Sequence, residues 1–388
     1  MLQIPLAKSE ISNYSQVVPA LYVLGDSLFD SGNNNLLPTL AKADFSPYGM
    51  NFNGGWPTGR FTNGRTVVDF IGLINLPLFL VHNVLDYLFL FFGRSFVRLP
   101  NAEFLGLPYS PPYLSIRRVF NPGQLTLTGL NFASGSCGIL PETGSDLGKC
   151  LNFGEQVGLF ERIVKEELPK HFTNSTELSN YLAKSIFVVS IGSNDYINNY
   201  LVTRDYDTSK RYTPQAYARL LVDKLSLHFR KLYRLGARKV IMFEIGPIGC
   251  IPSTTRQMKH NGTCVEEVNQ LAIMFNDNLA PMLQNLTSTL QGSTFVLGHG
   301  HWLGYDAAIN PSNYGLNDSS TACCVTWLNG TSGCIPELGA LACRDPEKHY
   351  FWDGYHLTET MYRTIATYCF NGSSVCIPKN IQQLISEA

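Results

Sequence analysis

Short apolar runs alternate with longer amphipathic stretches along most of the chain. The runs with the length and composition of buried strands lie at residues 20–24, 125–132, 186–191, 239–245 and 293–297. Strands that are covered on both faces read as nearly continuous apolar runs, because neither face of the sheet meets water. These segments are therefore predicted to form the interior of one sheet.

The longer stretches have the periodicity of amphipathic helices, with apolar residues three or four positions apart. They lie at residues 154–172, 213–237 and 265–290. The second begins with Thr213 and Pro214 and ends at Gly236, which are typical start and stop signals. In the third we expect a kink or a break at Pro281, because proline removes a backbone donor inside a helix.

Strands and helices that alternate in this order predict an α/β fold with a mainly parallel sheet between helices. In such sheets reactive groups gather at the carboxyl ends of the strands. The first run continues as "LYVLGDSLFDSGNN" at residues 21–34, so that Ser27 comes directly after a predicted strand end. An ordinary turn would also account for Gly25 and Asp26.

Residues 71–99 do not fit this alternation, because they form the most apolar stretch of the chain. They are long enough to span a membrane, but they are interrupted by Asn75, Pro77, His82, Asn83 and Asp86. An aspartate near the centre of a membrane helix costs about 2.5–3.5 kcal/mol on insertion scales. We therefore expect no stable membrane span here.

The composition is that of a globular protein. Of 388 residues, 45% are hydrophobic and 15% are charged, and the formal net charge is −1. Such a charge provides no general attraction for nucleic acids or acidic lipid surfaces, and no glycine-rich phosphate-binding loop is present. Nucleic-acid and nucleotide binding are therefore not expected, and nothing indicates an oligomeric state.

The ten cysteines fall into local groups. Three pairs are close in sequence, Cys137 with Cys150, Cys250 with Cys264 and Cys369 with Cys376, and a cluster contains Cys323, Cys324, Cys334 and Cys343. No C-x-x-C pair occurs, which argues against zinc-ribbon and thioredoxin-type sites. Disulfides that close surface loops explain the grouping better than buried free thiols do, although the pairing inside the cluster stays open.

Asn-x-Ser/Thr sequons agree with an oxidising compartment. They begin at Asn13, Asn174, Asn261, Asn285, Asn317, Asn329 and Asn371. Residues 1–16, by contrast, have no continuous apolar core and carry Lys8 and Glu10, so they do not resemble a secretory signal. The route by which the protein would reach such a compartment stays open.

A reactive serine needs a base within hydrogen-bond reach. The best candidate lies in "HYFWDGYHLTE" at residues 349–359, where Asp353 and His356 are close enough for the carboxylate to orient the imidazole. An Asp-x-x-His pair also occurs by chance in many chains. The other histidines have no aspartate in that position, and His299 and His301 in "GHGHW" have no further ligand spaced for a metal.

Acyl transfer also requires donors for an oxyanion, and two stretches that follow predicted strands are candidates. "NFASGSCGIL" at residues 131–140 offers backbone N–H groups among small residues, and "VVSIGSNDY" at residues 188–196 offers the amide of Asn194. Either stretch alone is also compatible with ordinary turn chemistry.

Together these motifs resemble the GDSL esterase/lipase family of the SGNH hydrolases, in its large plant branch. "GDSLFDSGNN", "NFASGSCGIL", "IGSNDY" and "FWDGYH" appear in the family order, and "PTGRFTNGRTVVDF" and "GPIGCIP" are similar to stretches of the plant branch. The resemblance implies that Ser27 is the nucleophile, with Asp353 and His356 completing a triad. It also implies that the N–H groups of Ser27 and Gly135 and the amide of Asn194 form the oxyanion hole.

The resemblance further implies a flavodoxin-like three-layer sandwich (the SGNH hydrolase fold), secretion, N-glycosylation, and hydrolysis of carboxylic esters, often of lipids. It covers residues 17–385 as a single domain, with two departures. Leu357 stands where most members have proline after the catalytic histidine. Residues 72–102 look inserted, and our hypothesis is that they come from a retained intron or a gene-model error.

The resulting prediction is a serine ester hydrolase that acts on lipid or other acyl esters through an acyl-enzyme and that needs no cofactor or metal. Two alternatives stay open. One is acyl transfer to a sugar or lipid hydroxyl at the same site. The other is a secreted glycoprotein that has kept the fold and lost turnover.

Overall fold

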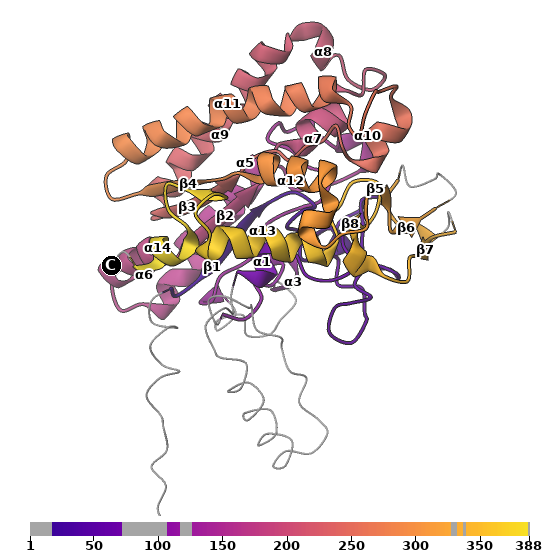
Figure 1. Cartoon of the computed structure of the whole chain (residues 1–388). Helices are drawn as coiled ribbons and strands as arrows, with labels where there is room; N and C mark the ends of the chain where they lie inside the picture. Colours follow the sequence, from indigo (N-terminus) through magenta and orange to yellow (C-terminus); the bar gives the residue numbers. More distant parts are fainter. Residues whose placement is uncertain (1–17, 72–106, 117–125, 327–331, 337–338, 387–388) are drawn as a thin grey trace, which may run out of the picture.

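The computed structural model describes residues 18–71, 107–116, 126–326, 332–336 and 339–386 (Figure 1). The N-terminal segment 1–16 and the suspected insertion at 72–102 lie outside the described residues. Among the described helices, none is long and apolar enough to cross a lipid bilayer.

The core of the molecule is a five-stranded sheet. Its strands are β1 (Leu21–Gly25), β2 (Ile186–Ser190), β3 (Lys239–Phe243), β4 (Thr294–Gly298) and β9 (Cys376–Ile377), in the spatial order β1-β2-β3-β4-β9. The first four are parallel, and β9 pairs antiparallel to β4. This confirms the α/β class, the mainly parallel sheet and four of the predicted strands.

The predicted strand at 125–132 is only partly formed. Its end runs parallel to β1, with the N–H of Val23 donating to Leu130 O at 2.9 Å and the N–H of Phe132 donating to Val23 O at 2.8 Å. The regular ladder is reduced to isolated bridges because Gly129 has φ +102° and lies against the backbone of Leu21. With this segment beside β1, the parallel order matches that of flavodoxin-like folds.

Helices cover both faces of the sheet, which makes a three-layer sandwich (Figure 1). One face packs against α5 (Phe153–Arg162), α6 (Ser175–Lys184), α9 (Pro214–Arg234) and α11 (Glu266–Thr289). The other packs against α1 (Val67–Phe70), α13 (Glu359–Asn371) and α14 (Ile381–Ser386). Successive strand residues alternate between the two cores, as for Tyr22 and Val23.

The predicted helices form, with two corrections. Thr213 caps α9 as expected, accepting a hydrogen bond from the N–H of Ala216. The expected break at Pro281 is wrong, because α11 runs through it with Leu279 and Leu283 buried on the same face. The helix predicted at 154–172 continues beyond α5 as a π-helical turn and then a 3-10 turn, rather than as one α-helix.

Short elements complete the fold around the carboxyl edge of the sheet. They are α3 (Tyr113–Ile116), α7 (Ser193–Asp195), α8 (Thr208–Arg211), α10 (Pro252–Gln257), α12 (Gly300–Ile309), and the strand pairs β5 (Asp318–Ala322) with β8 (His349–Phe351) and β6 (Cys324–Val325) with β7 (Leu341–Ala342).

All ten cysteines form disulfides, so the free-thiol interpretation is wrong. The three local pairs join as their spacing indicated. The cluster, whose pairing the sequence left open, joins Cys323 to Cys343 and Cys324 to Cys334. Both bonds lie within the β6–β7 region: one joins the residues next to the two strands, and the other joins β6 to the loop that follows it.

Candidate active site

Ser27 lies on a tight turn at the carboxyl end of β1. Gly25, the last strand residue, has φ +152°, and a Cβ atom there would lie 2.3 Å from the carbonyl oxygen of Ser190 on β2. Only glycine fits this approach. Gln156 of α5 holds the turn through both ends of its amide, at 2.8 Å from Gly25 N and 2.7 Å from Gly25 O. The strand therefore stops at Gly25, and the serine follows on the turn.

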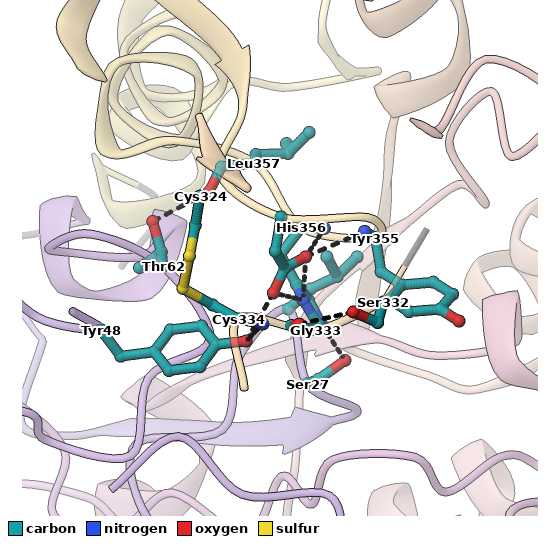
Figure 2. Close-up of polar contacts among 12 residues, drawn as sticks. Ser27, Tyr48, Thr62, Cys324, Ser332, Gly333, Cys334, Tyr355, His356 and Leu357 are labelled. Atoms are coloured by element: carbon teal, nitrogen blue, oxygen red, sulfur yellow. Dashed lines mark hydrogen bonds and ion pairs between the residues drawn. A yellow bond between two sulfur atoms is a disulfide. The ribbon is translucent and has the colours of Figure 1, made fainter. Parts of the chain in front are cut away.

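Asp353 and His356 lie in the loop between β8 and α13. Figure 2 shows His356 above Ser27. Ser27 Oγ is 2.8 Å from His356 Nε2, although the residues are 329 positions apart. His356 Nδ1 lies 2.8 Å and 2.9 Å from the two carboxylate oxygens of Asp353. The structure thus joins the three side chains in one hydrogen-bonded row.

Several groups hold the base in place. The N–H groups of Tyr355 and His356 donate to Asp353 Oδ1 at 2.9 Å and 2.8 Å. The carboxylate therefore stabilises the turn from Asp353 to His356. The ring of Phe61 lies 5.0 Å from the imidazole of His356, centroid to centroid. Leu357, which stands in the place of a proline, offers its carbonyl to the hydroxyl of Thr62 at 2.8 Å. The departure at Leu357 therefore leaves the loop anchored.

The pKa values of the buried carboxyl groups separate Asp353 from the aspartates near the serine. Burial opposes ionisation of Asp353, but the charge on His356 and the donated hydrogen bonds outweigh it, so its pKa is lowered. Burial raises the pKa of Asp26 to about 7, and that of Asp30 and Asp195 to about 6, against the hydrogen bonds that each accepts. Of these four buried carboxyl groups, Asp353 is the one whose pKa lies below its ordinary value.

The predicted oxyanion donors are placed unequally. Asn194 starts α7 beyond β2 and faces the same cavity as Ser27; its Nδ2 donates to Cys137 O at 3.0 Å, and its Oδ1 accepts from Asn198 Nδ2 at 3.0 Å. The N–H of Ser27 has no hydrogen-bond acceptor among the described residues. The N–H of Gly135, however, donates to Asp30 Oδ2 at 3.1 Å. Gly135 is therefore near the site, but its donor is already engaged.

The loop that follows Gly135 carries a backbone irregularity that the sequence did not indicate. Ser136 has φ +68°, the one positive value found for a non-glycine residue in the described part of the chain, and it lines the cavity beside Ser27. Asp195 holds this loop by accepting from the N–H groups of Ile139 and Leu140 at 2.8 Å and 3.1 Å. Strain held by such bonds is common beside functional groups.

A cavity of about 400 Å³ opens beside Ser27 and His356. Apolar side chains dominate its lining, among them Phe29, Val67, Phe243, Ile248 and Ile365. It runs across the carboxyl ends of β1 to β3 and reaches α13. An apolar cavity with few polar groups at the reacting end is the usual form of a small-molecule site.

The histidines set aside in the sequence have other surroundings. His299 Nδ1 pairs with Glu244 Oε1 at 2.9 Å, and His301 stacks on Tyr305. In the described part of the chain, the one cluster with ligand atoms close together is Cys343, Asp345 and His349, but Cys343 is bonded to Cys323 and offers no thiolate.

Sequence reasoning missed the residues that support this site, above all Tyr48, whose hydroxyl donates to Asp353 at 2.6 Å, and Phe61. Tyr48 lies in turn-rich sequence without a regular period, and Phe61 lies in the stretch "PTGRFTNGRTVVDF", whose likeness to the plant branch assigned it no role.

Comparison with known proteins agrees with this geometry. The sequence profile described as GDSL-like lipase/acylhydrolase matches residues 21–368. GDSL esterase/lipase 7 of Arabidopsis thaliana is 41% identical over 372 residues, which cover 95% of this chain and 92% of that protein. GDSL esterase/lipase At5g08460 of the same plant is 38% identical over 379 residues, covering 96% and 89%. A third, GDSL esterase/lipase At1g71691, is 36% identical over 372 residues, covering 95% and 86%.

Proposed function

Because this chain belongs to the GDSL-like lipase/acylhydrolase family, we propose that it hydrolyses carboxylic esters through an acyl-enzyme on Ser27. The matches confirm the resemblance drawn from the motifs and support an esterase type of activity. The single observation that carries the serine mechanism is the 2.8 Å contact between Ser27 Oγ and His356 Nε2. It puts a base where a weak nucleophile needs one.

The first half of the reaction forms the acyl-enzyme. Ser27 Oγ attacks the ester carbonyl carbon while its proton passes to His356 Nε2, and Asp353 stabilises the imidazolium from the Nδ1 side. His356 then gives that proton to the alkoxy oxygen as its bond to the carbonyl carbon breaks, and the alcohol leaves. In the second half, water attacks the acyl carbon with His356 again as the base, and the acid is released as Ser27 recovers its proton.

The negative charge on the carbonyl oxygen needs donors during both halves. The N–H of Ser27 and the second N–H of the Asn194 amide are the groups we assign to it, because both lie at the cavity and neither has another acceptor among the described residues. Gly135 can add its N–H only if that group leaves Asp30. We therefore rank Gly135 behind the other two donors.

The cavity supports an apolar acyl group as the preferred substrate part. Side chains such as Phe29, Phe243 and Ile365 offer no partner for a charged or strongly polar acyl chain, whereas burial of each methylene gains about 0.8 kcal/mol. A lipid or other long-chain ester is the substrate class that this lining favours.

We also propose that the protein is a secreted glycoprotein. The support is that all ten cysteines are paired and that the described sequon asparagines are exposed, namely Asn174, Asn261, Asn285, Asn317 and Asn371. Asn13 and Asn329 lie outside the described residues. A mass decrease after glycosidase treatment of protein from a plant secretion system tests this, and an unchanged mass contradicts it.

The decisive experiment compares wild type with Ser27→Ala. Wild type is expected to react with one equivalent of a fluorophosphonate and to hydrolyse p-nitrophenyl esters of graded acyl length, faster for longer chains. Ser27→Ala should lose both the label and about 10⁴-fold or more of kcat. Undiminished labelling or turnover of the alanine variant would rule out Ser27 as the nucleophile.

A further inference from the structure

The carboxylate of Asp353 receives a hydrogen bond from a segment far from its own loop. The hydroxyl of Tyr48 lies 2.6 Å from Asp353 Oδ2, across 305 positions of sequence. Asp353 Oδ1 already accepts from two backbone N–H groups of its own loop as well as from the imidazole. Among the residues that the structure describes, Oδ2 contacts the imidazole and Tyr48, and this hydroxyl is the one donor from outside the loop.

The direction of this hydrogen bond is determined by a second contact. The backbone N–H of Cys334 donates to the Tyr48 hydroxyl oxygen at 2.9 Å (Figure 2). Since an N–H can only donate, the oxygen is the acceptor there, and the phenolic proton is left to point at Asp353. Cys334 is itself joined to Cys324 by a disulfide. A chain of donors therefore runs from Cys334 through Tyr48 to Asp353.

Tyr48 has little freedom to leave this position. Its side chain is 2% exposed, and its ring packs edge-on against Phe45 and Phe61 and at a tilt against Trp352. Phe61 in turn lies against the imidazole of His356. The same aromatic cluster thus fixes the tyrosine hydroxyl and the plane of the base.

The effect on Asp353 follows from its complete burial. Burial favours the neutral carboxyl group, and the interactions that restore the carboxylate include the charge of His356 and the hydrogen bond from Tyr48, which together bring its pKa below the ordinary value. A neutral carboxyl group would hold the imidazole less firmly and could favour the wrong tautomer. Loss of the tyrosine donor should therefore weaken the base without removing any reacting atom.

We propose that Tyr48 is a positioning residue of the triad, which keeps Asp353 ionised and oriented so that His356 presents a free Nε2 to Ser27. This inference deepens the proposed function and rests on it. Cys334, held by its disulfide to Cys324, sets the direction of the tyrosine hydroxyl and so forms the outer end of the same row.

The test is Tyr48→Phe, which removes the hydroxyl and keeps the ring. The rate of Ser27 phosphonylation and kcat/KM for a p-nitrophenyl ester are measured from about pH 4 to about pH 9. We expect roughly 10- to 100-fold lower kcat/KM at neutral pH, chiefly through kcat, since hydrogen bonds to charged groups carry this much. The acid limb, which reports proton uptake by the coupled Asp353–His356 pair, should move to higher pH, because a carboxylate that has lost a donor draws a proton to the pair more readily.

Tyr22→Phe is the matched control. Tyr22 is also fully buried, and its hydroxyl is hydrogen-bonded to that of Tyr181 at 3.0 Å. It belongs to the core between the sheet and helices α5 and α6, whereas Tyr48 belongs to a separate cluster with Phe61 and Trp352. Tyr22→Phe should lose stability comparably and leave the acid limb in place. An acid limb that moves equally in both variants, or in neither, would overturn the proposal.

A second substitution guards against a Tyr48→Phe protein that does not fold. Incorporation of 3-fluorotyrosine at position 48 keeps the hydroxyl and makes it more acidic, so it donates more strongly and should move the acid limb to lower pH. A shift in the opposite direction, or none, would contradict the inference. If wild type takes no label on Ser27, the proposed function itself fails; if wild type is labelled and position 48 has no effect on the pH profile, only the role of Tyr48 fails.

Discussion

The two halves of the site are held by different means. The nucleophile side, residues 25–27 with 190–194, is held mainly by the sheet backbone: Gly25 packs directly on Ser190, and the N–H of Asp26 donates to the carbonyl of Ser190 at 3.1 Å. The amide of Gln156 adds two hydrogen bonds to Gly25. The base side, residues 352–357, is held by side chains from a distant segment, through Tyr48 to Asp353 and Thr62 to Leu357. The first half is part of the sheet, whereas the second is attached to it.

The two sides also differ in the ionisation of their buried aspartates. On the nucleophile side, burial raises the pKa of Asp26 to about 7, and one of its carboxylate oxygens has no partner among the described residues. On the base side, burial is outweighed by donors and by His356, so that the pKa of Asp353 is lowered. Burial alone therefore does not decide ionisation: Asp30 accepts several N–H groups and still has a raised pKa, whereas the charge of His356, together with donated hydrogen bonds, outweighs burial at Asp353.

The largest effect that sharpens the comparison is expected from Asn194→Ala. If the nucleophile side supplies the oxyanion donors, this variant should lose about 10²–10³ in kcat, with little change in KM. Asn198→Ala, which removes only the group that orients the Asn194 amide, should lose less. Equal losses in the two variants, or a loss below about tenfold for Asn194→Ala, would move the donor role elsewhere.

Substitutions on the nucleophile side should lower the free energy of unfolding more than substitutions on the base side. Gly25→Ala places a Cβ atom 2.3 Å from a backbone oxygen at a positive φ, so it should lower the free energy of unfolding by about 3 kcal/mol. Thr62→Val removes one hydrogen bond to Leu357 and should cost only about 1 kcal/mol. Denaturant unfolding monitored by circular dichroism measures both.

Gly158→Ala is the control for the glycine substitution. Gly158 lies inside α5, and no atom lies within 4 Å of the position that its Cβ would take. Alanine there should stabilise the protein by about 0.5–1 kcal/mol. If Thr62→Val proved as destabilising as Gly25→Ala, the distinction between a sheet-held and an attached half would be wrong.

A further prediction concerns pH and the carboxyl group of Asp26. The unfolded chain releases the Asp26 proton near pH 3.8, whereas the folded chain keeps it until about pH 7. The stability from this group is therefore complete below the lower value and is lost as the pH rises through the upper one. Asp26→Asn should abolish that loss, so its Tm should fall by about 2 °C less than that of wild type between about pH 5 and about pH 8.

Calorimetry across that pH range provides the measurement, and the direction is specific to the nucleophile side. Asp353, with its lowered pKa, contributes stability that is present above its unfolded value and is lost only when the pH falls through its folded value. Parallel Tm curves for wild type and Asp26→Asn would show that Asp26 is ionised in the folded protein throughout, against the effect of its burial.

Local patterns in the sequence were sufficient for much of the fold and for a set of candidate site residues. Continuous apolar runs predicted β1 to β4, and the cap at Thr213 predicted the start of α9, because strand burial and helix capping depend on neighbouring residues. Ser27, Asn194 and the pair Asp353 and His356 became candidates because each follows a strand end or forms a short motif, and the structure brings Ser27 and His356 into contact.

Contacts between distant segments were decided only by the tertiary structure. It paired the four clustered cysteines, engaged the N–H of Gly135 with Asp30, and brought the Tyr48 hydroxyl to Asp353. Burial of Leu279 and Leu283 also carried α11 through Pro281 against the local rule. The physical reason is that propensity and periodicity act over a few residues, whereas packing joins groups hundreds of positions apart, whose meeting no local spacing encodes.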